Sequence, residues 1–146
     1  MIQTKMFDES NKPTKEEKDK IVNFLYTHLE EFGDKKKYIQ KALDYSINEN
    51  SSFGGFTFLL IEKQNIIGAT VINKTGMGGY IPENILVYIA THKEHRGKGL
   101  GKKLMQFAIE NSVGDIALHV EAENPARHLY KKMGFTNPYL EMRLRK

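Results

Sequence analysis

Hydrophobic residues in the first third of the chain recur at helical spacing. Between Thr14 and Gly33, apolar side chains return every three or four positions, which is typical of an amphipathic helix with one buried face. Thr14 and Glu17 form a capping-box pattern at its start, and Gly33 is expected to end it in a left-handed conformation. A second amphipathic helix is expected up to Ile47, with Asp34 as its N-terminal cap.

From Phe56 onward the spacing changes to runs of β-branched and aromatic residues. The segments FTFLLIE (56–62) and IIGATVIN (66–73) predict two antiparallel strands joined by a turn at KQN (63–65). The glycine-rich segment KTGMGGYIPEN (74–84) predicts a loop. The next segment, ILVYIAT (85–91), is almost wholly apolar, as a central strand covered on both faces would be.

The second half of the chain returns to alternating helices and strands. Apolar residues from Leu100 to Ile109 predict a third helix, IALHVEA (116–122) predicts a strand, and NPARHLYKKMG (124–134) predicts a short helix. In YLEMRLRK (139–146), apolar and polar residues alternate, which predicts a last half-buried strand. The order strand, loop, helix, strand over residues 85–122 is a βαβ unit, which indicates two parallel strands.

The composition is that of one folded domain. A length of 146 residues, with 40% hydrophobic and 27% charged residues, fits a single domain over residues 1–146. The chain has no cysteine, which excludes disulfides, thiolate zinc sites and a cysteine nucleophile. Its first residues lack the apolar run of a signal peptide, and no apolar stretch could span a bilayer, so a cytoplasmic protein without a membrane partner is expected.

The net charge of +4 is partly concentrated in residues 93–103. Such a patch suits nucleic acid, an acidic protein or an anionic cofactor. Few aromatic residues lie here to stack bases, so no nucleic-acid partner is expected. His92 and His95 form a bare His-x-x-His pair without further ligands, and no metal site is expected.

Three alternating glycines stand between the apolar strand and the third helix. A helix start presents backbone N–H groups without partners and a partial positive charge, and glycines let an anion approach them closely. The spacing is not that of a P-loop, since Lys102 is followed by Lys103, nor that of a dinucleotide fingerprint, whose third glycine would fall at Lys102. The residues expected to bind a phosphate or diphosphate are Arg96, Gly97, Lys98, Gly99, Gly101 and Lys102.

The pattern Arg96-x-x-Gly99-x-Gly101 after an apolar strand, with LYKKMGF (129–135) downstream, resembles the GNAT superfamily of acyl-CoA-dependent N-acetyltransferases. The resemblance implies an α+β (mixed α/β) fold, with a mostly antiparallel mixed sheet of about six or seven strands flanked by about four helices. It also implies that acetyl-CoA binds at the glycine loop as co-substrate, without a metal. The acetyl group would pass directly to a primary amine of an acceptor substrate.

The resemblance further implies catalytic roles outside the glycine loop. Tyr130 would be the acid that protonates the departing thiolate of coenzyme A, although helical spacing also places Tyr130 on an apolar stripe. Glu83, just ahead of the apolar strand, would be the base. On the strand that follows the third helix, His119 and Glu121 share one side and are alternatives for that role.

The pantetheine arm of the coenzyme would contact the backbone of Ile89 and Thr91 and the side chain of Asn124, unless Asn124 instead caps the short helix. The acceptor stays open among small molecules, peptides and proteins. A non-catalytic acyl-CoA-binding regulatory module is the alternative to an enzyme, because the base is only loosely matched. Dimers are frequent in the family, so a homodimer is compatible with the resemblance.

Overall fold

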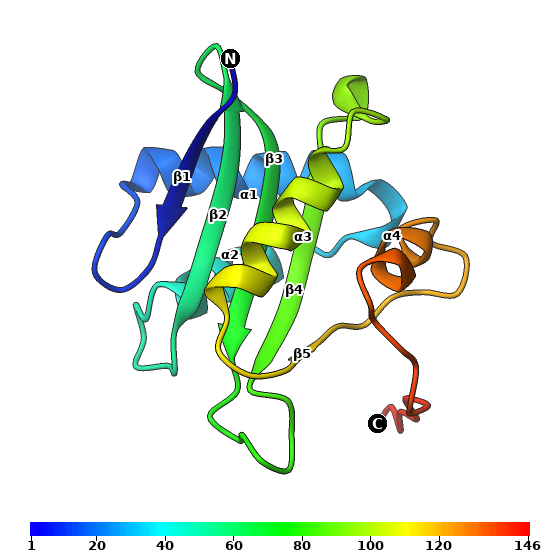
Figure 1. Ribbon diagram of the computed structural model, residues 1–146. Helices are drawn as coiled ribbons and strands as arrows, with labels where there is room; N and C mark the ends of the chain where they lie inside the picture. Colours follow the sequence, from blue (N-terminus) through cyan, green and yellow to red (C-terminus); the bar gives the residue numbers. More distant parts are fainter.

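The computed structural model describes residues 1–146 and contains a five-stranded mixed sheet with helices on both faces (Figure 1). The strands lie in the order β1-β2-β3-β4-β5, with bounds Gln3–Phe7, Gly55–Glu62, Asn65–Lys74, Asn84–Thr91 and Ile116–Ala117. All neighbours are antiparallel except β4 and β5, which are parallel. The expected α+β class is confirmed, with five strands instead of the expected six or seven.

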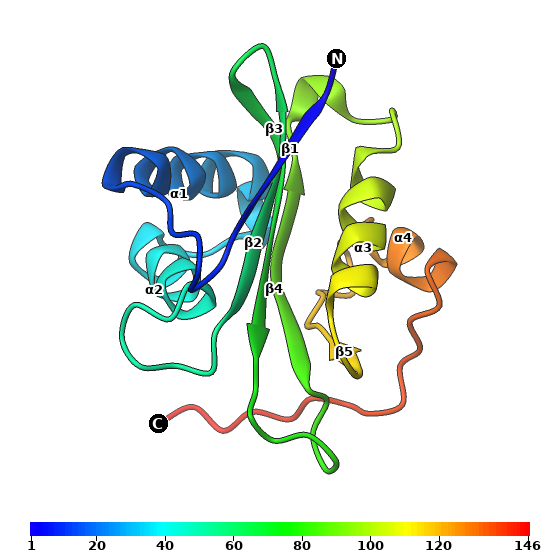
Figure 2. The same cartoon turned by 60° about the vertical axis from the view of Figure 1, so that its left-hand side comes forward.

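Two helices lie on each face of the sheet (Figure 2). Helices α1 (Lys15–Leu29) and α2 (Lys36–Ser46) cover one face, and α3 (Leu100–Asn111) and α4 (Arg127–Lys132) lie on the other. Short 3-10 helices, η1 (Glu30–Phe32) and η2 (Lys93–His95), follow α1 and β4. None of the helices has the length and apolar character needed to cross a membrane.

The sheet divides the hydrophobic core into two layers. Leu25 and Val71 are fully buried between the sheet and the helices α1 and α2, and Leu60 and Leu104 are fully buried on the α3 side. Burying each such side chain contributes about 1.5–3 kcal/mol, so these two layers provide the main force that holds the helices on the sheet.

The ends of the first two helices follow the sequence only in part. The capping box is confirmed: Thr14 Oγ1 accepts a hydrogen bond from the Glu17 amide at 3.1 Å, and Glu17 Oε1 accepts one from the Thr14 amide at 2.9 Å. Gly33 is not left-handed, because its φ is −97° and the turn η1 follows α1 without a break. Asp34 does not cap α2, whose N-cap is Lys35. The carboxylate of Asp34 instead accepts a hydrogen bond from Tyr88 on β4.

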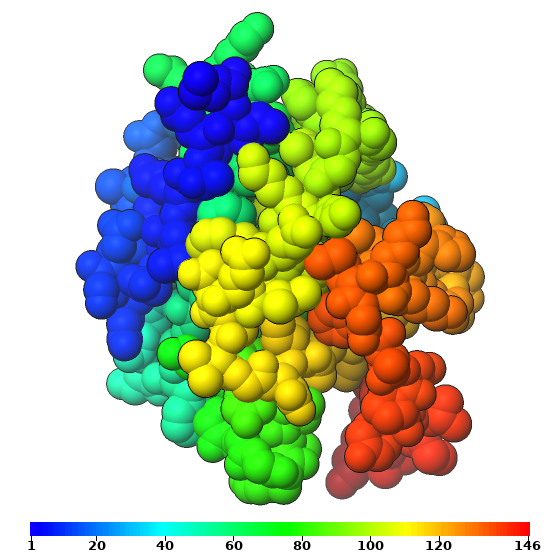
Figure 3. Space-filling model, viewed as in Figure 1, coloured from blue at the N-terminus to red at the C-terminus, as the bar shows by residue number.

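Both ends of the chain differ from the prediction. Residues 3–7 form the unpredicted edge strand β1. The predicted strand at 139–146 is wrong: residues 135–146 form no strand, and Leu140, Met142 and Leu144 are 85–91% exposed on a segment that projects from the body (Figure 3). Of the strand predicted at 116–122, only Ile116–Ala117 pairs. Alternating apolar and polar residues indicate that a strand could bury one face, but the strand forms only if a sheet edge lies close enough to pair with it.

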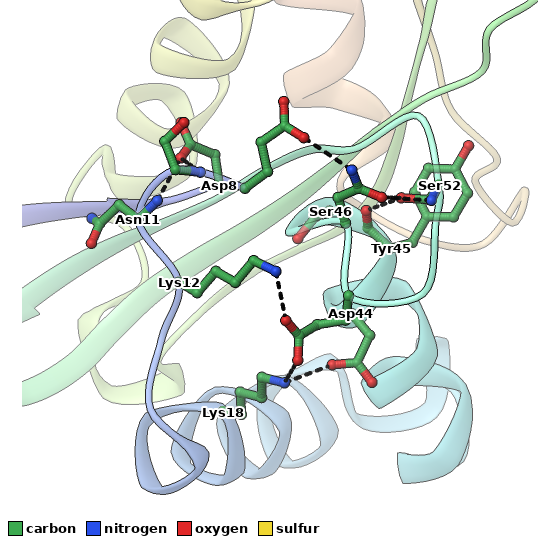
Figure 4. A network of polar contacts seen from close by, with 12 residues as sticks. Asp8, Asn11, Lys12, Lys18, Asp44, Tyr45, Ser46 and Ser52 are labelled. Atoms are coloured by element: carbon green, nitrogen blue, oxygen red, sulfur yellow. Dashed lines mark hydrogen bonds and ion pairs between the residues drawn. The ribbon is translucent and has the colours of Figure 1, made fainter.

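A polar network fastens α1 to the end of α2 and to the turn after β1 (Figure 4). Lys18 Nζ lies 3.2 Å from Asp44 Oδ1 and 3.0 Å from Glu49 Oε2. Lys12 Nζ, in the segment between β1 and α1, lies 2.9 Å from Glu49 Oε1. The network thus ties together the two helices that cover one face of the sheet.

Candidate functional site

The edge of β4 that faces β5 is open over most of its length. β4 pairs with β5 only at Asn84 and Ile85. On the other edge, the His92 amide donates to the Ile67 carbonyl at 2.8 Å, which directs the backbone of residue 92 toward β3. Because successive residues of a strand direct their backbone polar groups to opposite edges, those of Thr91 and Ile89 point toward the open edge.

A bulge lies in the middle of β4. Val71 pairs with Tyr88 and Ile72 pairs with Leu86, so Val87 is the extra residue. A bulge bends a strand and re-aims the residues beside it. The open stretch of β4 that contains Ile89 and Thr91 begins just after this bend.

The glycine loop, residues 96–101, begins at the end of η2 and leads into α3. Gly97 and Gly99 have φ values of 81° and 77°, in the left-handed region that favours glycine. Gly101 is helical and serves a different purpose: a Cβ there would lie 3.1 Å from Leu129 Cδ2, so its missing side chain lets α4 pack close to the first turn of α3.

The backbone amides of the glycine loop have no acceptor within the protein. No amide from Arg96 to Lys102 donates a hydrogen bond, and the first intrahelical bond of α3 runs from the Lys103 amide to the Gly99 carbonyl at 3.1 Å. These donors stand at the positive end of the α3 dipole. The loop therefore offers several donors to an anion, as the sequence predicted for a diphosphate.

The basic residues of this loop have different roles. Arg96 Nη1 lies 3.0 Å from Glu30 Oε1, and Arg96 Nη2 donates to the His28 carbonyl at 2.8 Å. Arg96 therefore fastens the loop to the end of α1. Lys98 and Lys102 are exposed and form no ion pair, so their charges are available to an anionic ligand.

Tyr130 lies on α4, and its ring belongs to the same buried cluster as Leu86 and Leu100. The residue is 7% exposed, and burial raises the pKa of Tyr130 to about 12. Its hydroxyl forms no hydrogen bond within the protein, and it is not among the fully enclosed polar atoms that lack a partner. The two sequence interpretations are thus compatible, because the ring packs in the core while the hydroxyl stays protonated and available.

Glu83 lies at the opposite end of β4 from the glycine loop (Figure 1). The eight residues of β4 separate the two by roughly 25 Å. Glu83 Oε1 accepts a hydrogen bond from the Asp115 amide at 2.9 Å, and this backbone bond lowers the pKa of Glu83. The Glu83 carboxylate thus joins the start of β4 to the segment that leads into β5.

The remaining residues of the predicted site lie between β5 and α4. Asn124 Oδ1 accepts a hydrogen bond from the Ala126 amide at 2.9 Å, so its side chain caps the turn that leads into α4. His119 is exposed, whereas its neighbours Leu118 and Val120 pack against the α3 side of the core. His119 is therefore open to solvent beside this part of the core.

One contact near this site was missed by sequence reasoning. The hydroxyl of Tyr88 on β4 donates to Asp34 Oδ2 at 2.6 Å, and burial together with this carboxylate raises the pKa of Tyr88. Asp34 belongs to the connection between α1 and α2, so the bond fixes that connection beside the bulge. A tyrosine in an otherwise apolar strand was the only signal, and it did not identify a partner 54 residues away.

Comparison with known proteins shows the family. The model of the acetyltransferase (GNAT) domain matches residues 54–137, so the chain belongs to the GNAT acetyltransferase family. A curated relative, N-alpha-acetyltransferase 30 of Schizosaccharomyces pombe, is 27% identical over 85 residues, which cover 55% of this chain and 57% of the relative. The match thus spans little more than half the length of that relative.

Solved structures share the fold at low sequence identity. A ribosomal-protein-alanine N-acetyltransferase from Brucella melitensis is 14% identical with a TM-score of 0.67, covering 100% of this chain and 99% of that one. A GNAT family acetyltransferase from Streptococcus pneumoniae is 16% identical with a TM-score of 0.71, covering 100% and 98%. The NatC complex, solved with Gag peptide and CoA, contains a chain 23% identical with a TM-score of 0.68, covering 92% and 84%.

Proposed function

We propose that this protein is an acetyl-CoA-dependent N-acetyltransferase whose acceptor is the α-amino group of a peptide or protein. Membership of the GNAT acetyltransferase family supports the activity, and the curated relative is named for acetylation of α-amines. The observation that carries the proposal is the arrangement around the start of α3. The open edge of β4, the unpaired amides of the glycine loop and the helix that bears Tyr130 meet there.

The donor would bind by its diphosphate and its pantetheine arm. The amides of residues 97–102 and the charges of Lys98 and Lys102 suit the diphosphate. The free backbone groups of Ile89 and Thr91 suit the amides of the pantetheine, which would lie against β4 like an added strand. Asn124 uses Oδ1 as a cap, and its Nδ2 remains a donor that suits a carbonyl of the pantetheine.

The transfer needs a neutral amine and a proton for the leaving thiolate. The amine nitrogen bonds to the thioester carbon, the carbon–sulfur bond breaks, and the sulfur takes a proton. Tyr130 would supply that proton, because its raised pKa keeps the hydroxyl protonated at neutral pH. The amine must also lose a proton, and His119, which is exposed between β5 and α4, is the candidate acceptor.

The acceptor class follows from the demands on this base. A peptide α-amine has a pKa of about 7.7–8.0, whereas a lysine side chain has one of about 10.4. At neutral pH a substantial fraction of α-amines is therefore already neutral, and a weak base suffices. An acceptor that is already partly neutral places the smaller demand on the base, so we propose an α-amine rather than a lysine side chain.

The test measures thiol release from acetyl-CoA with a panel of acceptors. The panel contains short peptides with free N-termini, the same peptides with a blocked N-terminus and one lysine, a polyamine and an aminoglycoside. We expect thiol release with the free peptides, with the acetyl group on the α-nitrogen by mass spectrometry. Binding of acetyl-CoA without acceptor-dependent thiol release would instead support a non-catalytic binding module. Turnover confined to small amines would overturn the acceptor class.

A further inference from the structure

Three histidines meet where the end of α1 contacts the segment that leads into the glycine loop. His28 lies on α1, and His92 and His95 lie between β4 and α3. The ring centroids of His28 and His92 are 4.2 Å apart, and those of His92 and His95 are 5.3 Å apart. His28 is buried, and the ring centroid of Phe24 lies 4.6 Å from that of His28. We call these three residues the histidine cluster.

Hydrogen bonds define the protonation state of His28. Its Nδ1 accepts a hydrogen bond from the Lys93 amide at 3.3 Å. An imidazole nitrogen that accepts a hydrogen bond carries no proton, so this contact requires neutral His28 with its proton on Nε2. The carbonyl of the same residue accepts the 2.8 Å bond from Arg96. His28 therefore holds the segment 93–96 at two points, immediately before Gly97.

The charges around His28 oppose its protonation. His92, Lys93 and Arg96 face it from the segment before the glycine loop, and Glu30 faces it from η1. Glu30 is the only acidic group among them, and its carboxylate is already paired with Arg96. Burial first, and then the three basic neighbours, lower the pKa of His28.

The outer part of the histidine cluster adds another titratable pair. His95 Nε2 lies 3.4 Å from Glu62 Oε1 at the end of β2, and His95 Nδ1 is buried without a partner. His92 Nδ1 accepts a hydrogen bond from the Glu94 amide at 3.1 Å. A proton on His28 would remove the acceptor of the Lys93 amide and place a like charge beside Lys93 and Arg96.

We propose that His28 is a positioning residue for the donor site: neutral His28 holds the segment 93–96, and so orients the glycine loop, while its protonation releases the loop and weakens acetyl-CoA binding. The proposal rests on the proposed binding of acetyl-CoA at this loop. It assigns to α1 a role in donor binding, and it makes that binding sensitive to acid.

The experiment compares three proteins by calorimetric titration with acetyl-CoA from about pH 8 to about pH 5.5. In His28→Asn, the amide oxygen lies near the position of Nδ1 and accepts a hydrogen bond without titrating. In His28→Leu, the acceptor is lost at every pH. His128→Asn, on the exposed side of α4, is the matched control. Titration of the phosphates of the ligand is common to all variants, so differences between variants isolate the histidine.

As the pH is lowered, the wild-type protein and the His128→Asn control should lose roughly three- to tenfold more affinity for acetyl-CoA than His28→Asn loses. This difference corresponds to the loss of one hydrogen bond. His28→Leu should bind weakly throughout. Equal pH dependence in wild type and His28→Asn would overturn the proposal. Failure of the wild type to bind acetyl-CoA at any pH would overturn the proposed function itself.

A second measurement needs no ligand and covers the case in which His28→Leu does not fold. In the free wild-type protein, NMR should show the Lys93 amide shifting with the same midpoint as the His28 ring as the pH is lowered. In His28→Asn the Lys93 amide should not show this titration. A Lys93 amide that is indifferent to the titration of His28 would refute the anchoring contact.

Discussion

Replacing Tyr130 with phenylalanine removes one hydroxyl and leaves the packed ring in place. That hydroxyl forms no hydrogen bond within the protein, so its loss leaves no partner unsatisfied. The ring keeps its contacts in the cluster that contains Leu86 and Leu100. We therefore expect the melting temperature of Tyr130→Phe to stay within about 2 °C of the wild type.

The expected effect on turnover is much larger than the effect on stability. A positioned general acid contributes about 10²–10⁴-fold to the rate, which corresponds to about 2.7–5.4 kcal/mol of the barrier. Tyr130→Phe should thus lower kcat by at least about a hundredfold. The Kd of acetyl-CoA should change by less than about twofold, since the hydroxyl acts on the leaving sulfur rather than on binding.

The assay follows thiol release at saturating acceptor, with the Kd of acetyl-CoA and a thermal melt measured on the same preparations. Tyr139→Phe, in the exposed C-terminal segment, is the matched control and should behave like the wild type. Because the pKa of Tyr130 is about 12, the wild-type rate should show no loss from its ionisation below about pH 10. A kcat within twofold of the wild type in folded Tyr130→Phe would refute the acid role.

Three further predictions address the loop charges, the far end of β4 and the first helix. Replacing Lys98 and Lys102 together with alanine should weaken acetyl-CoA binding by about two- to tenfold at low salt and by less at high salt. The control is Lys20→Ala with Lys41→Ala, which removes the same charge elsewhere and should not change the affinity. Equal losses of affinity in the two double variants would contradict a specific site for the anion. Glu83→Gln should keep kcat within about twofold, and a large loss in a folded protein would restore Glu83 as the base. Because the folded-state pKa of Glu83 is lowered, its stabilising contribution is present above the unfolded value of 4.5 and is lost as the pH falls through the folded value. The free energies of unfolding of the wild type and Glu83→Gln, measured in urea, should therefore become equal in acid. Thr14→Ala should lower the free energy of unfolding by about 1 kcal/mol, and Thr14→Ser should not; similar values for both would contradict the capping role.

The sequence by itself determined the features that depend on neighbouring residues. The capping box of Thr14 and Glu17 formed as predicted, because both partners lie within one helical turn. The turn between β2 and β3 formed where the polar residues Lys63 and Gln64 adopt positive φ values. The glycine loop also lies where it was predicted, at the start of a helix after an apolar strand. Periodicity, capping and backbone freedom are local properties, so the chain carries them in any context.

Only the tertiary structure decided which distant residues share the site. It joined Asp34 to Tyr88. It also turned Arg96 toward α1 and placed His28 against the segment that carries the loop. These contacts join residues 54 to 68 positions apart, and they depend on how the helices pack on the sheet. A one-dimensional pattern reports the chemistry of a side chain, whereas the packing of the whole core determines what that side chain meets.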